Sequence, residues 1–504
     1  MEQETKDEKQ LHTETVVTDA DSDIDLRDKD EALKLVGLEK TAEFTEEFYN
    51  RLKRKQDWVI PPLCAAVYFT QYLDKTALSY ASIMGFPVTG QGYNTVALSF
   101  YIGFLIWVFP TMYMAQRLRL AKYLGGNIVA WGVIMMLHAV PNSFGAFFAL
   151  RLLLGMLESC VAPTLILIIS MFYKKDEQGS RIAWFYMMNG VAGIVGGFLA
   201  FGISFIPDRG FAPWKIIYLL LGAMAITVGI LVLLFMPDSP ANALMLTREE
   251  RIAAIERIRD QQGGTENKRL KKEQVIEALL DIRTWLIVLA TLLTNIPNGG
   301  LANFTNIIVK GFGYTTKQTL ILSTPGGAIG IISAVACGWY SDRAGERMLP
   351  IVWSLIPTLA GAAMLVGLNG TGQKGALLFA TWIVGTYGSS LAIIYAYNAS
   401  NTSGHTKKVT VNAMTLAAFC VANIVGTETF LPKDAPDYFP GKISILVLLS
   451  AQLFLCFIIR WVNGWMNKKK RRALEEMKAR NGWTDADIKR ERERAAFVDM
   501  TDKQ

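Results

Sequence analysis

The sequence predicts an all-α membrane protein with 12 transmembrane helices in two six-helix bundles, and three observations lead to this prediction. Of the 504 residues, 51% are hydrophobic and 19% are charged. The mean hydropathy of +0.27 is higher than that of an ordinary soluble domain. The charged residues gather in 1–57, 237–283 and 466–504. Between them, apolar stretches recur at about the 20-residue length that crosses a bilayer.

The apolar stretches give the order of the expected helices. The first six are Trp58–Tyr80, Tyr93–Met114, Leu124–Val140, Phe144–Phe172, Ile182–Phe205 and Trp214–Met236. The second six are Thr284–Val309, Thr319–Tyr340, Leu349–Leu368, Ala376–Tyr397, Val409–Phe430 and Ile443–Trp465. We therefore expect one bundle at 58–236, a linker with short surface helices at 237–283 and a second bundle at 284–465.

Basic residues in the short loops predict how the chain is oriented, because lysine and arginine are enriched in cytosolic loops. Alternate loops carry them, whereas the loops after the first and third helices carry no charge. The basic loop residues are Arg117, Arg119, Lys122, Lys174, Lys175, Arg181, Arg343, Arg347, Lys407 and Lys408. We expect the linker and both tails, 1–57 and 466–504, in the cytosol, with a disordered N-terminal tail. The expected location is the plasma membrane, with an endomembrane as the alternative.

Cysteine and histidine are few and scattered. The five cysteines lie in apolar runs without a Cys-x-x-Cys pair, and the three histidines are far apart in the sequence. We therefore expect no metal site and no cofactor. The net charge of +7 comes from lysine and arginine at helix ends, which membrane topology explains better than nucleic-acid binding. The chain also lacks a recognisable nucleophile motif, so we do not expect an enzyme.

Ionisable residues in a membrane helix are costly, so each one marks a candidate functional site. Asp74 and Lys75 stand side by side in the first expected helix. Neighbours on a helix point about 100° apart, so the two side chains face different directions. Lys75 shares its face with Gln71, and we expect this face to line a polar cavity.

The fourth expected helix contains Arg151 and Glu158, which lie two turns apart on one face with Gly155 between them. One face of this helix would then present both the Arg151 cation, which could bind an anionic substrate, and the Glu158 carboxylate, which could bind a proton. The alternative is that Asp74, Lys75, Arg151 and Glu158 only neutralise one another as structural ion pairs.

Further polar residues interrupt the second half of the chain. The seventh expected helix contains Pro297 among polar residues, so we expect it to bend or break and to line a cavity. The polar candidates for substrate binding either line the cavity or form hydrogen bonds between helices. They are Asn189, Asn298, Asn303, Tyr395, Asn398 and Asn423.

The loop between the eighth and ninth expected helices contains the sequence Gly338-Trp-Tyr-Ser-Asp342-Arg343-Ala-Gly345-Glu-Arg347. It resembles the Gly-x-x-x-Asp-Arg-x-Gly-x-Arg signature of the major facilitator superfamily. The equivalent loop of the first half keeps the arginines but has Gln116 at the Asp position. The resemblance implies the major facilitator fold and a gating role for this motif. The gating residues it implies are Gly338, Asp342, Arg343, Gly345, Arg347 and Arg117.

Other segments between residues 54 and 465 are similar to the anion:cation symporter family and its fungal allantoate permease-like branch. They are Leu73-Asp74-Lys75, Arg151 to Glu158 with Pro163, Pro237-Asp238-Ser239-Pro240 and Gly404 to Lys408. The resemblance implies that Lys75 lies near a substrate anion and that Asp74, Arg151 and Glu158 take part in coupling. In the eleventh helix, proteins of this branch often have the sequence Gly-Asn-Ile-x-Gly-Pro. At the last two of these positions this chain has Gly426-Thr427, followed by Glu428.

These residues predict a secondary active transporter that works by alternating access, a proton symporter of a small organic anion. The family resemblance implies a substrate that is a ureide such as allantoate or ureidosuccinate, or a vitamin with a carboxylate. In this hypothesis a proton on Asp74 or Glu158 frees Lys75 and Arg151 to bind the anion. The alternatives are a carrier of thiamine, an amino acid or a small peptide, and a nutrient sensor with the transporter fold. We expect a monomer in the lipid bilayer, without a nucleic-acid partner.

Overall fold

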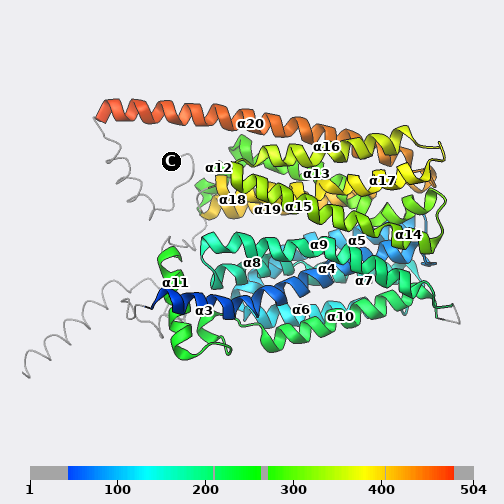
Figure 1. Ribbon diagram of the computed structural model, residues 1–504, viewed down its shortest axis with the longest axis horizontal. Helices are drawn as coiled ribbons and strands as arrows, with labels where there is room; N and C mark the ends of the chain where they lie inside the picture. The colour runs from blue at the N-terminus through cyan, green and yellow to red at the C-terminus, as the bar shows by residue number, and fades with distance from the viewer. Residues whose placement is uncertain (1–43, 208–210, 263–270, 403–404, 482–504) are drawn as a thin grey trace, which may run out of the picture.

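The computed structural model describes residues 44–207, 211–262, 271–402 and 405–481. In these residues the regular secondary structure is helical, without a β-strand. The helices lie side by side, and Figure 1 shows those up to α10 in one half of the molecule and α13 to α20 in the other. The predicted all-α fold with two helical bundles is confirmed.

The first half holds six predicted spans. Its helices are α4 (Ile60–Ser82), α5 (Gln91–Arg117), α6 (Leu120–Leu137), α7 (Phe144–Glu158), α8 (Val161–Phe172), α9 (Lys175–Ile203) and α10 (Pro213–Phe235). The fourth span is divided into α7 and α8 by a turn at Ser159 and Cys160. Of the 12 spans, 11 are long enough and apolar enough to cross a membrane, judged by length and composition. α4 completes the set with 23 residues, and Asp74 and Lys75 lower its hydropathy.

The second half holds the other six spans, two of them divided. Its helices are α13 (Ile282–Gly311), α14 (Thr316–Leu322), α15 (Thr324–Ala344), α16 (Met348–Gly367), α17 (Lys374–Val384), η3 (Gly385–Tyr387), α18 (Gly388–Asn401), α19 (His405–Thr427) and α20 (Phe439–Asn481). A short turn, η4 (Pro432–Asp434), precedes α20. α14 and α15 together form the eighth span, and α17, η3 and α18 form the tenth.

The expected break in the seventh helix is wrong, because α13 is one helix of 30 residues with Pro297 inside it. A proline removes one backbone hydrogen bond, and neighbouring polar groups can compensate for it in a membrane helix. In this part of α13 the Asn295 Nδ2 donates to the Thr291 carbonyl at 2.7 Å, and Asn303 Nδ2 donates to the Gly299 carbonyl at 2.9 Å. The asparagines therefore bond within the helix that they were expected to interrupt.

Glycines set the closest helix contacts around the centre. In the first half, a Cβ atom at Gly155 of α7 would clash with the Phe100 carbonyl of α5, and one at Gly103 would clash with the Leu152 carbonyl. In the second half, a Cβ atom at Gly426 of α19 would clash with the Ile296 carbonyl of α13. These contacts fix α5 against α7 and α13 against α19, and α7, α13 and α19 carry five of the candidate site residues, Arg151, Glu158, Asn298, Asn303 and Asn423.

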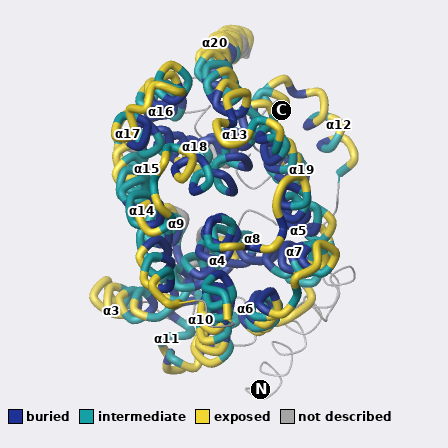
Figure 2. Tube along the Cα trace, turned by 90° about the vertical axis from the view of Figure 1, so that its right-hand side faces the viewer, coloured by how far each residue is buried: buried dark blue, intermediate teal, exposed yellow. Residues whose placement is uncertain are grey.

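The two halves are joined by hydrogen bonds at one end of the bundle, which we call the joined end. In Figure 2, which views the molecule along the helices, α4, α5 and α9 face α13, α15 and α19 of the other half. The joined end holds the pairs Asn306–Ser79, Tyr93–Asn303, Asn94–Thr427, Asn94–Phe430, Gln91–Glu428, Lys310–Ile83 and Thr316–Ile83. The unusual Glu428 thus accepts a hydrogen bond from the opposite half.

The other end of the bundle carries the basic loops, and we call it the basic end. Helices extend beyond the bundle there, into both segments that were expected to be tails. α3 (Glu46–Asp57) precedes α4 and begins at a Thr45 cap, and α20 continues for 16 residues beyond Trp465. Residues 1–43 and 482–504, which contain the rest of the tails, lie outside the described residues.

The linker is anchored to each half separately. It contains η2 (Pro240–Asn242), α11 (Arg248–Gln262) and α12 (Lys272–Leu280), so the predicted short helices are present. α11 contacts the first half through the ion pairs Lys55–Glu250, at 2.7 Å, and Arg257–Glu177. α12 contacts the second half, where Glu277 pairs with Lys407 of α19 at 3.0 Å.

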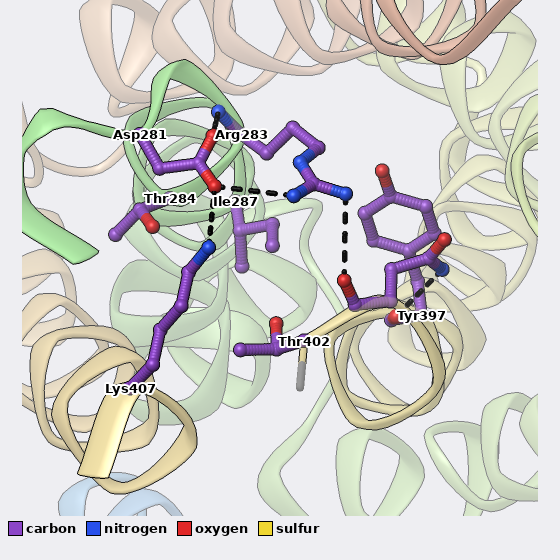
Figure 3. Close-up of a pocket in the computed structure, with 8 residues that line it drawn as sticks. Asp281, Arg283, Thr284, Ile287, Tyr397, Thr402 and Lys407 are labelled. Carbon is purple, nitrogen blue, oxygen red and sulfur yellow. Dashed lines mark hydrogen bonds and ion pairs between the residues drawn. The ribbon is translucent and has the colours of Figure 1, made fainter. Parts of the chain in front are cut away.

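A small pocket at the basic end shows how α13, α18 and α19 meet (Figure 3). Asp281, the N-cap of α13, accepts from the buried Lys407 Nζ at 2.8 Å and from Arg283 at 3.2 Å. Burial favours the neutral acid, but the Lys407 hydrogen bond and the Arg283 charge outweigh it and lower the pKa of Asp281 to about 2. The carboxylate therefore stays ionised at physiological pH.

Candidate functional site

Asp74 and Lys75 point into different parts of the molecule, as their neighbouring positions on α4 require. Asp74 is buried on the face that packs within the first half, whereas Lys75 is half-buried and faces α5 and α19. One turn of α4 thus presents a carboxyl group to the interior of one half and an ammonium group to the boundary between the halves.

The buried carboxyl groups of Asp74 and Glu158 lie beside each other between α4 and α7. No described side chain donates a hydrogen bond to either oxygen of Asp74 or to Oε1 of Glu158. Arg151, on the same face of α7, attracts both carboxyl groups, and its guanidinium contacts the Tyr218 hydroxyl at 3.5 Å. Two acids and one guanidinium therefore share a buried site, where both acids cannot readily be ionised together.

The Lys75 ammonium lies over two neighbouring aromatic rings from opposite halves. Its Nζ atom is 5.5 Å from the ring centroid of Tyr101 on α5 and 5.6 Å from that of Phe419 on α19. Both distances fall within the range of cation–π attraction. Glu158 also attracts Lys75 electrostatically, but no ion pair within 4.0 Å joins them among the described residues.

Amide side chains of the second half face this boundary. Asn298 Nδ2 on α13 donates to Asn423 Oδ1 on α19 at 2.9 Å, and the Tyr387 hydroxyl donates to Asn298 Oδ1 at 3.2 Å. Asn423 Nδ2 in turn donates to the backbone carbonyl of Phe419 at 2.7 Å. This chain of hydrogen bonds links the backbone of Phe419, whose ring contacts Lys75, to the polar part of α13.

Three more candidates surround the same region. Gln71 lies beside Glu158, Asn189 on α9 lies beside the Tyr68 hydroxyl, and Tyr395 on α18 lies near Tyr186. Asn189 Oδ1 is buried without a hydrogen-bond donor among the described residues. Polar groups of both halves therefore converge near Lys75.

Asn303 and Asn398 lie away from this group and have partners of their own. Asn303 belongs to the joined end, where its carbonyl accepts from the Tyr93 hydroxyl at 2.8 Å. Asn398 is near the basic end of α18, where it donates to Asn412 at 2.8 Å and accepts from Thr402 at 2.9 Å. Their contacts agree with the alternative of hydrogen bonds between and within helices.

The residues of the gating motif lie at the basic end of α15. Gly345 ends this helix with a φ of 59°, a conformation that glycine adopts more easily than other residues. Arg347 donates to Ser341 at 2.8 Å, and Arg343 lies over the Trp339 ring at 5.3 Å. Gly338 has open space around it, Arg117 lies over Tyr113 at 5.4 Å, and the Asp342 side chain lies outside the described part.

Sequence reasoning missed Tyr101, Phe419 and Tyr387. An aromatic residue in an apolar helix gives no signal by itself, because it is expected in any packed core. These rings became candidates only when the fold brought α5, α19 and η3 next to Lys75 and Asn298. Among the described residues, no group of three or more His, Cys, Asp and Glu side chains is arranged to hold a metal ion.

Comparison with known proteins identifies the family. The model of the Major Facilitator Superfamily matches residues 64–427, which include α5 to α19 and most of α4. The chain belongs to the major facilitator superfamily. It is therefore a multi-pass membrane transporter, and the two bundles are the two halves of the major facilitator fold.

Individual relatives narrow this assignment. The allantoate permease of Saccharomyces cerevisiae is 32% identical over 94% of this chain and 88% of the permease. The thiamine pathway transporter of the same yeast is 30% identical over 95% of this chain and 93% of that transporter. Within the major facilitator superfamily, the chain belongs to the branch that contains the allantoate permease.

A solved structure supports the fold independently. The crystal structure of a D-xylose-proton symporter covers 79% of this chain, and the match covers 96% of that protein, with a TM-score of 0.58. The sequence identity is 14%, so this likeness concerns the major facilitator fold alone.

Proposed function

We propose that the protein is a proton-coupled symporter of a small organic anion. The observation that carries this proposal is the buried pair of Asp74 and Glu158 beside Arg151, with the Lys75 ammonium on the next position of α4. A proton site and a cation for an anionic substrate thus lie within one turn of one helix. Binding of the proton can therefore affect binding of the anion directly, without a long pathway of contacts through the protein.

The carboxyl pair is suited to take up and release one proton. Two ionised acids side by side repel each other, and a single shared proton removes this repulsion and supplies the missing donor. When the proton is bound, Arg151 and Lys75 have fewer negative charges to balance, so their attraction for a carboxylate increases. After the bundle opens to the cytosol, the anion leaves first and the proton second.

The proposed substrate site lies between the halves. Lys75 would bind the carboxylate, and amide and hydroxyl groups would bind its other polar atoms. The proposed contributors are Gln71, Arg151, Asn189, Asn298, Tyr395 and Asn423. Asn303 and Asn398 are weaker contributors, since each is engaged with neighbours at an end of the bundle.

The direction in the membrane follows from the basic loops. We assign the basic end, the linker 237–283 and both tails to the cytosol, because positive residues are retained on that side. The joined end then faces outward, and hydrogen bonds such as Asn94–Phe430, at 2.9 Å, close the outer side. The gating motif at the basic end would close the inner side in the alternate conformation. The plasma membrane is the proposed location.

A ureide such as allantoate, or a vitamin with a carboxylate, is the proposed substrate class. The relative named as an allantoate permease supports the first, and the position of Lys75 supports an anion in general. A second candidate is a thiamine-related compound, which the name of the other yeast relative favours. The absence of a carboxylate on thiamine makes it a poor match for Lys75.

Uptake into yeast cells that lack their own carriers tests the proposal. The panel contains labelled allantoate, ureidosuccinate, nicotinate, pantothenate, thiamine and cysteine, each at external pH 5 and pH 7.5. Stronger accumulation of one anion at pH 5, after correction for its own ionisation, is the expected result. Accumulation of thiamine alone would replace the anion proposal. If a protein at the cell surface accumulates none of these compounds, the proposed substrate class is wrong.

A further inference from the structure

The Lys75 ammonium contacts aromatic rings from both halves. The Tyr101 ring belongs to α5 and the Phe419 ring to α19, at 5.5 and 5.6 Å from Nζ. Asp74, the adjacent residue, points away toward Glu158 and Arg151. A half-buried ammonium group loses part of its hydration and needs compensation, and here the compensation includes an aromatic ring of the opposite half.

The position of Phe419 is well determined. Its backbone carbonyl accepts from Asn423, which is bonded to Asn298, and Gly426 packs α19 tightly on α13. The side chain also lies against Phe104 of α5, with the ring centroids 6.5 Å apart. Phe419 therefore moves with the second half, whereas Lys75 moves with the first. Rocking of the halves changes the distance between this ring and the ammonium.

We propose that Phe419 is a positioning residue that holds the Lys75 ammonium while no anion is bound. The ring compensates the charge in the empty carrier and stabilises the arrangement in which the joined end is closed. A substrate carboxylate then replaces the ring as the partner of Lys75. This inference rests on the proposed function only in the last step, because the contact itself involves no substrate.

The first test measures the closed population without any substrate. Gln91 and Glu428, hydrogen-bonded across the joined end at 2.9 Å, are both replaced by cysteine and treated with a short bifunctional methanethiosulfonate. The five native cysteines are buried, and single-cysteine proteins give the background. Phe419→Leu should lower the ratio of cross-linked to uncross-linked protein roughly two- to thirty-fold, the range of a cation–π interaction. Phe419→Tyr should keep it near the original value.

Two controls separate the cation–π contact from packing. Phe104→Leu removes a ring of the same helix interface that does not lie over Lys75, so its effect should be smaller. In a Lys75→Gln background, Phe419→Leu should have no further effect. Equal effects of Phe419→Leu and Phe104→Leu would overturn the proposal. The same conclusion follows if the Phe419→Leu effect persists without Lys75.

A transport assay tests the last step, with allantoate as the probe. Net uptake requires return of the empty carrier, whereas counterflow exchanges labelled for unlabelled substrate without it. Phe419→Leu destabilises the empty carrier with the joined end closed, so it should ease the return step and raise the ratio of net uptake to counterflow several-fold. An unchanged ratio would contradict a role in the empty carrier. If the unmodified protein does not carry allantoate, the proposed substrate fails. The cross-linking result still decides whether Phe419 holds Lys75.

Discussion

Glu158 and Asp74 give the first residue-scale prediction, since they lie together without a described hydrogen-bond donor for Asp74. Glu158→Gln replaces one acid by an amide that can donate to Asp74, so the pair no longer needs a proton. We expect this variant to lose accumulation against a gradient while it keeps counterflow. Uptake of the compound that the unmodified protein accumulates, compared at external pH 5 and pH 7.5, measures this loss of accumulation. Retained dependence on pH in Glu158→Gln would remove Glu158 from the proposed coupling.

Lys75 gives the second residue-scale prediction. Loss of a charged hydrogen-bond partner is worth roughly 1.5–3 kcal/mol, so Lys75→Ala should raise the KM of an anionic substrate about 10- to 100-fold. Lys75→Arg keeps the charge and should restore most of the affinity. Initial uptake rates over a range of concentrations give KM for each variant. Equal KM values for the unmodified protein and Lys75→Ala would exclude Lys75 as the anion partner.

The directions of these side chains could be predicted from sequence because they depend only on helix geometry. A 100° turn per residue separates Asp74 from Lys75 and aligns Arg151 with Glu158, and the structure has both arrangements. The partners could not be predicted in the same way. Phe419 contacts Lys75 only because α5 packs on α19, and nothing local distinguishes Asn298 from Asn303, which bonds at the joined end.

At the scale of elements, the contact of α5 with α7 depends on glycine. A methyl group at Gly155 would clash with the Phe100 carbonyl, whereas Gly145 of the same helix has open space. Gly155→Ala should therefore lower the stability by roughly 1–3 kcal/mol, and Gly145→Ala should leave it unchanged or raise it slightly. Melting curves of the purified protein in detergent compare the two. Equal melting temperatures for both variants would mean that α7 can move away from α5 at little cost.

Asp281 anchors α12, α13 and α19, and its low pKa gives a prediction for pH. A carboxylate whose pKa is lowered on folding stabilises the folded state above its unfolded pKa, and this contribution is lost as pH falls to the folded pKa. For Asp281 the loss should extend from about pH 4 down to its folded pKa of about 2. Asp281→Asn should melt at a lower temperature than the unmodified protein at pH 7, with the difference shrinking below pH 4. A difference that stays constant down to pH 3 would assign the effect to packing.

Element boundaries show what a hydropathy pattern predicts and what it misses. The 12 apolar stretches are all present as helical spans, because crossing a bilayer requires paired backbone groups. The divisions at Ser159 and at η3, and the continuity of α13 through Pro297, were not predicted. They depend on contacts with neighbouring helices. Likewise, α3 lies in a polar segment, but Thr45 caps it and its charges pair with α9 and α11.

For the whole molecule, the hydrogen bonds at the joined end, together with separate anchoring of the linker to each half, describe one conformation of an alternating-access carrier. Lys75 and the carboxyl pair lie near the middle of α4 and of the span formed by α7 and α8, where rocking of the halves would change access from one side to the other. In the proposed function, this movement carries one anion together with at least one proton.

Uptake by proteoliposomes under an imposed pH gradient tests this claim most directly. The protein is reconstituted with a lumen at pH 7.5, and labelled allantoate is added outside at pH 7.5 or at pH 5, with the membrane potential clamped. We expect transient accumulation above the outside concentration only when the outside is acidic, and we expect a protonophore to abolish it. Equal uptake at both outside pH values, unaffected by the protonophore, would contradict proton coupling.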